Sequence, residues 1–312
     1  MFYCIALGLF LCSKINHVSS NDLNVDGCVF EGLSNSAGGG AIYVKSDCLL
    51  GVKLCTFSMC SAQNNGGSIY CESKICDFYS ICVFKCTVVG NYWGQFAKMT
   101  NTDRCNMRYL SLCKCPHNSV GYYPISTGFG SQVLQNSNCS QASVVWGESI
   151  WFREPSTLVC SYNSFVDNKA SDCICLYVSA GSGLRSMSHS NFVNNIQLSS
   201  SYSLIVTQYK GSLDIMEAIF INNSRTLFYT DGESSIRAIN CVVVHLYSLL
   251  SGTVTIENPQ YSNTATYGLN HFRSFYCHAD LLEPTSKIRI IMPSKIMVYC
   301  FIFINIVGSL YQ

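Results

Sequence analysis

Two pairs of acidic residues are the candidates for acid–base or cation chemistry, because each pair is close in sequence. Asp167 is followed by Asp172, and Asp231 is followed by Glu233. Cleavage of a glycosidic bond needs two convergent carboxyl groups, and a Ca²⁺ site needs several oxygen ligands on one face. The 18 acidic residues are otherwise spread almost singly. We therefore interpret these four as solvated turn residues and expect no catalytic residues.

Metal-ligating residue types come together at one place, His271 with Cys277 and His278. Their spacing matches no common zinc pattern and supplies fewer than four ligands. The sequence also contains no Gly-x-Ser-x-Gly nucleophile motif and no phosphate-binding glycine loop before a helix. We therefore predict no metal site and no cofactor.

Two pairs of cysteines are separated by a single residue, Cys113 with Cys115 and Cys173 with Cys175. In an extended strand, residues i and i+2 lie on the same face, so each pair brings two thiols together. No Cys-x-x-Cys motif of the zinc or thioredoxin type accompanies them. We interpret these cysteines as packing or disulfide partners.

The charge balance argues against a nucleic-acid partner. Nineteen Lys and Arg stand against 18 Asp and Glu in 312 residues, so the chain has no basic field to bind phosphates. Twenty cysteines are more than cytosolic proteins commonly carry, which predicts an oxidising compartment. An apolar share of 48% indicates an extensive core or a membrane segment.

A repeat with a constant period organises the first third of the chain. The triplet Cys-x-Phe occurs at Cys28–Phe30, Cys55–Phe57 and Cys82–Phe84, and the interval between successive copies is the same. A glycine follows each cysteine at a fixed distance, and the first two glycines begin similar segments that contain Tyr43 and Tyr70. The period is about 27 residues, and a fixed period between about 20 and 50 residues indicates a unit that must stack on its copies to bury its apolar face.

The same phase reappears later in the chain. Phe165, Phe192 and Phe220 each begin a motif of the form Phe-x-(Asp or Asn)-Asn, and Phe165 lies three whole periods after Phe84. Residues 105–150 keep this phase without the motif. We expect two degenerate turns and a bulging loop there.

Each period holds short runs of β-forming residues separated by Gly, Asn, Ser and Asp, without helical periodicity. Such a coil pairs each strand in parallel with its copy one period away. The sequence therefore predicts an all-β fold, a right-handed parallel β-helix of about nine turns over residues 24–257. We expect an internal aromatic ladder of the six repeated phenylalanines, and beside it an internal ladder of mostly reduced thiols at Cys28, Cys55 and Cys82.

The segment from Phe30 through Gly39–Tyr43, repeated from Phe57 to Tyr70, resembles the GGAI-type repeats of polymorphic outer membrane proteins. It is also similar to right-handed β-helix surface proteins of protists such as trichomonads. The resemblance is specific over residues 26–97, weaker over 160–230 and absent after about 260. The large C-terminal membrane barrel of the bacterial family is not resembled, which favours the eukaryotic type. The resemblance implies a β-helix at the cell surface and says little about ligands.

Both ends of the chain carry apolar segments. Residues 1–20 contain an apolar run of signal-peptide length, and the alternative is a first buried strand of the fold. Residues 296–311 carry no charge and are slightly short for a membrane-spanning helix, so we expect either an anchor or a packed cap. A juxtamembrane or capping segment, 258–295, would precede it. Glycosylation sequons begin at Asn138 and Asn222.

These observations predict a cell-surface or secreted interaction and adhesion module without catalysis. On a solenoid, outward-facing residues such as Tyr43 and Tyr70 recur one above the other and form a strip that suits contact with a glycan or protein. The alternative is a carbohydrate-active lyase or hydrolase on the same fold, although the Asp-Asp and Gly-His-Gly motifs of pectin-hydrolysing β-helices are missing. Expected partners are an unknown surface ligand and, through the C-terminal segment, a membrane.

Overall fold

A computed structural model of the chain describes residues 2–116, 121–144, 147, 150–171, 173–181, 183–198, 203–223, 226–244 and 250–269, with the backbone alone at 2–11 and 250–251. These residues belong to a compact unit, Met1–Leu282, and a second unit comprises Glu283–Gln312. All named elements are β-strands, and the described residues contain no helix. The predicted all-β parallel β-helix is confirmed.

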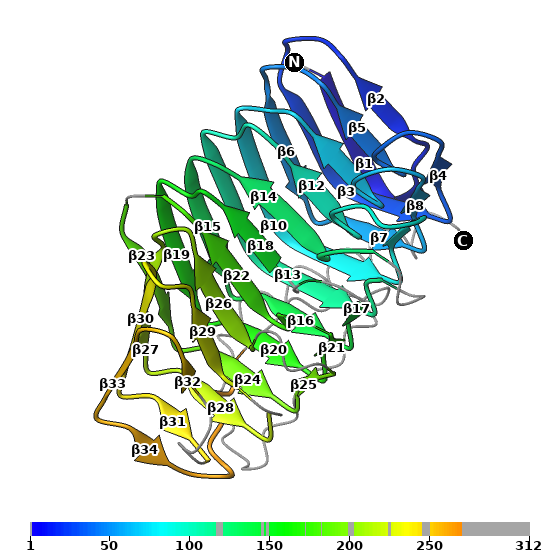
Figure 1. Ribbon diagram of the computed structural model, residues 1–312. Coiled ribbons are helices and arrows are strands. Elements are labelled where there is room, and N and C mark those ends of the chain that lie inside the picture. Colours follow the sequence, from blue (N-terminus) through cyan, green and yellow to red (C-terminus); the bar gives the residue numbers. More distant parts are fainter. Residues whose placement is uncertain are drawn as a thin grey trace. The chain divides into compact units, whose positions relative to one another are not determined.

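Successive coils of the chain stack so that each strand pairs in parallel with its counterpart one coil away (Figure 1). Sheet A is the eighteen-stranded sheet, formed by β1 (Phe2–Leu11), β3 (Leu23–Glu31), β6 (Leu49–Lys53), β7 (Thr56–Ser58), β10 (Ile75–Phe84), β13 (Arg104–Cys113), β15 (Ser131–Gln135), β16 (Asn138–Ser140), β19 (Thr157–Ser161), β20 (Ser164–Val166), β23 (Arg185–Ser188), β24 (Asn191–Val193), β27 (Ser212–Met216), β28 (Ile219–Ile221), β30 (Ser235–Ile239), β31 (Val242–Val243), β33 (Val254–Glu257) and β34 (Gln260–Tyr261).

Sheet B is the ten-stranded sheet, formed by β2 (Ile15–His17), β5 (Ile42–Val44), β9 (Ile69–Cys71), β12 (Ala97–Met99), β14 (Ile125–Gly128), β18 (Ile150–Arg153), β22 (Leu176–Ser179), β26 (Ile205–Gln208), β29 (Phe228–Thr230) and β32 (Leu250–Ser251). Two small sheets each contain three strands. They are β4 (Ser34–Asn35), β8 (Ser61–Ala62) and β11 (Thr87–Val88), and β17 (Ser143–Val144), β21 (Lys169–Ala170) and β25 (Ile196–Gln197).

The solenoid has about eight turns, close to the nine expected. Its strands continue past both ends of the predicted range 24–257, because β1 pairs with β3 and β34 pairs with β31. Residues 2–11 form β1, and both a cleaved signal and a buried first strand stay predictions. Residues 296–311 lie outside the described residues. Among the described residues, no helix has the length and apolar character needed to cross a membrane.

The coils from β3 to β28 each bend at two corners within sheet A, and a residue with positive φ occupies each of these corners. Leu54, Ser80 and Tyr109 hold the first corner in successive coils, with φ of 51°, 56° and 57°. The left-handed conformation costs most residues about 1–2 kcal/mol, and Asn and Asp tolerate it better. The later coils use these tolerant types at the second corner, as expected for the residues after phenylalanine: Asp167, Asn194 and Asn222.

The aromatic ladder lies in the core in two stretches. Phe30 stacks on Phe57 with ring centroids 4.9 Å apart, and Phe192 stacks on Phe165 and Phe220 at 5.0 and 4.8 Å. All five side chains are fully buried and keep the offset geometry that favours aromatic pairs. Between the stretches, smaller side chains fill the same row of the register: Val83, Leu112 and Cys139.

The prediction that Phe84 belongs to this ladder is wrong. Val83 pairs with Phe57, because this coil is one residue shorter than the repeat period. Successive side chains of a strand point to opposite faces, so a slip of one residue turns Phe84 outward. Phe84 is only half-buried there, and Lys85 Nζ lies 5.1 Å from its ring centroid.

The predicted thiol ladder breaks at the same coil. Cys28 and Cys55 are buried and form no disulfide, as expected. In the strand register, Cys82 instead lies opposite Thr56, one position out of phase. The Cys82 side chain forms a disulfide bond. The prediction of a reduced, in-phase ladder is therefore wrong at Cys82, and the register shift has the same cause as that of Phe84.

A column of side chains that hydrogen-bond to neighbouring coils follows the second corner. In the early coils these are thiols, since Cys60 Sγ donates to the Phe30 carbonyl at 3.4 Å and Cys86 Sγ to the Phe57 carbonyl at 3.5 Å. A thiol is a weak donor, and a buried carbonyl needs a partner. These cysteines thus supply hydrogen-bond donors to backbone carbonyls buried inside the solenoid.

Asparagine takes this position in the later coils and forms the asparagine ladder, Asn168, Asn195 and Asn223. Asn195 Nδ2 donates to the Phe165 carbonyl at 2.9 Å and to Asn223 Oδ1 at 2.9 Å. Asn168 Nδ2 donates to Asn195 Oδ1 at 3.0 Å. The repeated Phe-x-x-Asn motif therefore builds an aromatic ladder and a polar ladder together.

Candidate functional site

The acidic residues considered for chemistry make surface contacts. Asp167 is exposed at a corner, and Asp172 lies outside the described residues. Asp231 Oδ2 accepts a hydrogen bond from the Tyr209 N–H at 2.6 Å, and Glu233 pairs with Lys210 Nζ at 2.9 Å. Asp231 and Glu233 are therefore held by separate partners, and of the other pair only Asp167 belongs to the described residues.

Within the described ranges, no group of three or more His, Cys, Asp or Glu is placed to hold a metal ion. The cluster at residues 271–278, which contains His271, Cys277 and His278, lies outside these ranges. The two cysteine pairs separated by one residue are buried in the solenoid and form no disulfide, which fits the packing alternative: Cys113, Cys115, Cys173 and Cys175.

Another group of thiols is buried beside sheet B. Cys71 Sγ lies 3.5 Å from Cys76 Sγ and 2.7 Å from Ser73 Oγ. The hydrogen bond from Cys76 lowers the pKa of Cys71, whereas the hydrogen bond with Cys105 raises the pKa of Cys76. Reactive cysteines combine thiolate character with access, and these side chains are fully buried. We interpret the group as part of the core.

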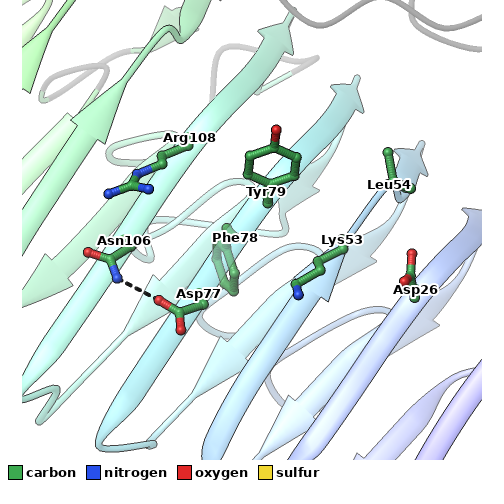
Figure 2. A pocket seen from close by; sticks show the side chains of 8 residues that line it. All are labelled: Asp26, Lys53, Leu54, Asp77, Phe78, Tyr79, Asn106 and Arg108. Carbon is green, nitrogen blue, oxygen red and sulfur yellow. Dashed lines mark hydrogen bonds between the residues drawn. The ribbon is translucent and has the colours of Figure 1, made fainter. Parts of the chain in front are cut away.

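Sheet A carries a cavity of about 470 Å³ on its outer face (Figure 2). Asp77 accepts a hydrogen bond from Asn106 Nδ2 at 2.6 Å on one side of it. The register aligns four further lining residues in one outward column: Asp26, Lys53, Tyr79 and Arg108. Its charged lining residues are two carboxylates and two cations, so this cavity is electrically balanced.

Sheet B presents a row of aromatic side chains on its outer face. The two tyrosines expected to form a strip, Tyr43 and Tyr70, are stacked with ring centroids 5.4 Å apart. Further along, Trp151 contacts Trp93 at 5.3 Å and Tyr123 at 4.9 Å. We call this register row of sheet B the aromatic row, although three of its positions are not aromatic. In order along the solenoid it contains Tyr43, Tyr70, Lys98, Ser126, Trp151, Tyr177, Val206 and Tyr229.

Trp93 and Trp151 are among the residues that line a pocket of about 100 Å³, and we refer to it as the tryptophan pocket. Lys98 Nζ lies 4.3 Å from the Trp93 ring centroid, and Arg153 Cζ lies 5.3 Å from that of Phe129. Both distances are within the range of a cation–π interaction. The charged lining residues are both cationic, and the rest are mostly small or polar: Met99, Thr100, Asn101, Ser126, Thr127 and Gly128.

The absent side chain of Gly128 opens this pocket. A Cβ atom placed on Gly128 would meet no atom within 4 Å, and the residue pairs with Arg153 of β18. The next residue, Phe129, has a φ of 63°, which is strained for a bulky side chain. Its N–H donates to the Arg153 carbonyl at 2.7 Å. The chain thus bends sharply beside the guanidinium and places an aromatic ring under it.

A buried polar network supports this bend from inside the tube. Thr127 Oγ1 donates to Gln132 Oε1 at 2.8 Å, and Thr102 Oγ1 donates to the Gly128 carbonyl at 2.8 Å. Gln132 Nε2 in turn donates to the Phe129 carbonyl. The Thr127, Thr102 and Gln132 side chains are fully buried, and satisfied networks of this kind rigidify their surroundings. The tryptophan pocket is therefore preformed.

Electrostatics inside the pocket favour an anion. Burial, together with the neighbouring charge of Arg153, lowers the pKa of Lys98 to about 8, while Glu72 acts in the opposite direction. Lys98 therefore keeps its proton at pH 7 but is poorly solvated. An anionic ligand would compensate this charge. Glu154 contacts Arg153 Nε at 3.4 Å in an exposed pair, which contributes little.

The two glycosylation sequons differ in access. Asn138 is 1% exposed in β16, so its side chain is out of reach in the folded chain. Asn222 is exposed at a corner of the solenoid, with a φ of 52°. Modification of Asn222 is compatible with the fold, whereas modification of Asn138 is not.

No protein-family model, curated protein or solved structure matches this chain. Function must therefore be argued from the site, because a solenoid hosts many functions. Sequence reasoning found Tyr43 and Tyr70 but missed the tryptophan pocket, which lies around the degenerate region 105–150. Counting single coils onward from Tyr70 could have found Lys98 and Trp151, since both lie in the aromatic row.

Proposed function

We propose that this chain is a cell-surface or secreted interaction module that binds an extended ligand along the aromatic row of sheet B. The observation that carries the proposal is two sets of ring contacts along sheet B, Tyr43 with Tyr70, and Trp151 with Trp93 and Tyr177. Exposed Tyr and Trp rings offer large, rigid contact area with a polar end, and they are enriched at binding surfaces. A solenoid repeats such rings along one line, which suits a glycan or an extended protein.

A binding panel tests this proposal. Purified protein is presented with polysaccharides and with extracellular proteins, and binding is compared for the wild type and a Tyr43→Ala, Tyr70→Ala double variant. We expect the variant to bind at least tenfold more weakly while its thermal unfolding is little changed. Tyr261→Ala serves as the matched control, because Tyr261 is an exposed tyrosine on sheet A that lines neither the cavity of sheet A nor the tryptophan pocket. Equal loss in the control and the double variant would contradict the proposal.

A second candidate function, a carbohydrate-active lyase or hydrolase, is favoured by the cavity of sheet A. Asp26 and Asp77 line it together with Lys53 and Arg108, and sugar cleavage uses carboxylates with nearby proton donors or acceptors. The same polysaccharide panel is scored for new reducing or unsaturated ends. Turnover that disappears in Asp26→Asn and Asp77→Asn would establish the enzyme, and binding without turnover would favour the interaction module.

The proposed location is the outside of a cell, and it is supported by the 20 cysteines and the apolar segment 296–311. Membrane fractionation of the full chain and of residues 1–285 tests it. We expect the full chain in the membrane fraction and the shortened chain in the soluble fraction. Equal partition of both into the soluble fraction would contradict the anchor.

A further inference from the structure

We propose that the tryptophan pocket receives the acidic group of an anionic sugar, so that the ligand of the aromatic row is an acidic glycan. This inference rests on the proposed function and names the class of its ligand. Carboxylate-bearing and sulfated sugars share the required chemistry, which is a compact anion attached to a ring that can lie on an aromatic face.

The size of the pocket fits an acidic group better than a whole sugar. Its volume of about 100 Å³ lies below the roughly 300–1,000 Å³ of pockets that enclose a whole small ligand. A carboxylate or sulfate occupies such a space, and the sugar ring must then lie outside it. Trp93, which lines the pocket and is 36% exposed, offers an aromatic surface for that ring.

Charge selects an anion. Lys98 and Arg153 approach the pocket from two strands, β12 and β18, and no carboxylate is among its lining residues. A guanidinium can bind a carboxylate or sulfate through two parallel hydrogen bonds, and an ammonium adds a point charge. The balanced cavity on sheet A has no such preference.

The position of the pocket favours a glycan over an acidic peptide. Extended peptides commonly add a strand to a free sheet edge, and this pocket lies on the face of sheet B, where β14 is already paired on both sides with β12 and β18. The neighbouring Ser126 and Asn101 side chains supply a hydroxyl and an amide group that suit sugar hydroxyls. The test therefore has to exclude the binding of an acidic peptide to this pocket.

The test uses the full chain and matched probes. Binding is measured for a glucuronate-containing polysaccharide, its carboxyl-reduced form, a sulfated polysaccharide, and a poly-glutamate peptide. We expect the carboxyl-reduced form to bind at least tenfold more weakly than its acidic parent. Tighter binding of either the carboxylated or the sulfated chain identifies the source of the anion. Equal binding of the reduced and acidic forms, or tighter binding of the peptide, would overturn the proposal.

Variants at Gly128 and Arg153 locate the site. Gly128→Leu fills the pocket, whereas Gly128→Ala adds one methyl group into open space and is its control. We expect Gly128→Leu and Arg153→Gln to lower affinity for the acidic glycan about tenfold or more, and Gly128→Ala to lower it less than threefold. Arg153 is exposed, so its variant keeps the test valid if Gly128→Leu fails to fold.

The failure of this inference is separable from that of the proposed function. If Tyr43→Ala with Tyr70→Ala abolishes binding while Gly128→Leu and Arg153→Gln leave it unchanged, the aromatic row binds the ligand and the acidic-group pocket is wrong. If all of these variants bind like the wild type, both proposals are wrong.

Discussion

Lys98 is the residue whose charge should make ligand binding depend on pH. Its pKa of about 8 lies well below the ordinary value of about 10.4, with Arg153 on β18 and Glu72 after β9 as its charged neighbours. The proton is present at pH 7 and is lost as the pH rises through about 8. We predict that affinity for an acidic glycan falls severalfold between pH 7 and pH 9, as measured by titration at constant ionic strength.

Lys98→Met is the control for this pH dependence. It should bind more weakly at pH 7 and show little change up to pH 9, and identical profiles in both proteins would contradict the role of Lys98.

The lowered pKa of Lys98 also affects folding. The unfolded chain holds this proton more tightly than the folded chain, so the contribution of Lys98 to stability should rise as the pH increases from about 8 to about 10.

The asparagine ladder gives a second prediction for a single residue. Asn195→Ala leaves the buried Phe165 carbonyl and the backbone N–H of Asn168 without their hydrogen-bond partner. Each unsatisfied group costs about 1–3 kcal/mol. We predict a loss of about 3 kcal/mol in the free energy of unfolding, measured in urea. Asn222→Ala, at an exposed corner, should cost about 1 kcal/mol through its positive φ alone. Equal losses would show that the ladder contributes nothing specific.

At the scale of the strand, the alternation of faces separates two phenylalanines of the same repeat. Phe57 is fully buried in β7 between Phe30 and Phe96, and Phe84 ends β10 on the outer face. We predict that Phe57→Ala lowers the free energy of unfolding by about 3–5 kcal/mol. Phe84→Ala should lower it by less than about 1 kcal/mol, as for most surface substitutions. Comparable losses in urea denaturation would contradict the observed register.

The same strands show how far the sequence could predict this structure. Composition and repeat predicted the fold class, and the Phe-x-x-Asn motif identified the later rungs at Phe165, Phe192 and Phe220. A fixed period could not locate every rung, because single coils differ by a residue and one residue reverses the face. Phe84 and Cys82 were therefore misplaced. The tryptophan pocket depends on Gly128 and on the strained Phe129, and no periodic signal marks either position.

At the scale of the whole solenoid, buried thiols can report where the coils open first. Each coil contacts only its neighbours, so end coils have fewer stabilising contacts than central ones. Cys241 lies near the last strands, and Cys105 lies in a central coil, and both are buried and free. We predict that Cys241 is alkylated faster than Cys105 in mild urea, as measured by pulse labelling and mass spectrometry.

Partly exposed Cys12 is the positive control and should react without denaturant. If Cys241 and Cys105 react at a single rate at every urea concentration, the solenoid opens as one cooperative unit and the prediction fails.

The asparagine ladder also affects how such a chain can change during evolution. Each asparagine side chain of the ladder donates a hydrogen bond to the asparagine of the next coil. The asparagine of an additional, identical coil would therefore find the same donor and acceptor groups in its neighbours. Tandem duplication of one coil therefore introduces no unsatisfied polar group and no mismatch in the aromatic ladder. It also lengthens the outer face by one more contact for a polymeric ligand. Avidity could then rise through the number of coils, without any change in the affinity of a single contact.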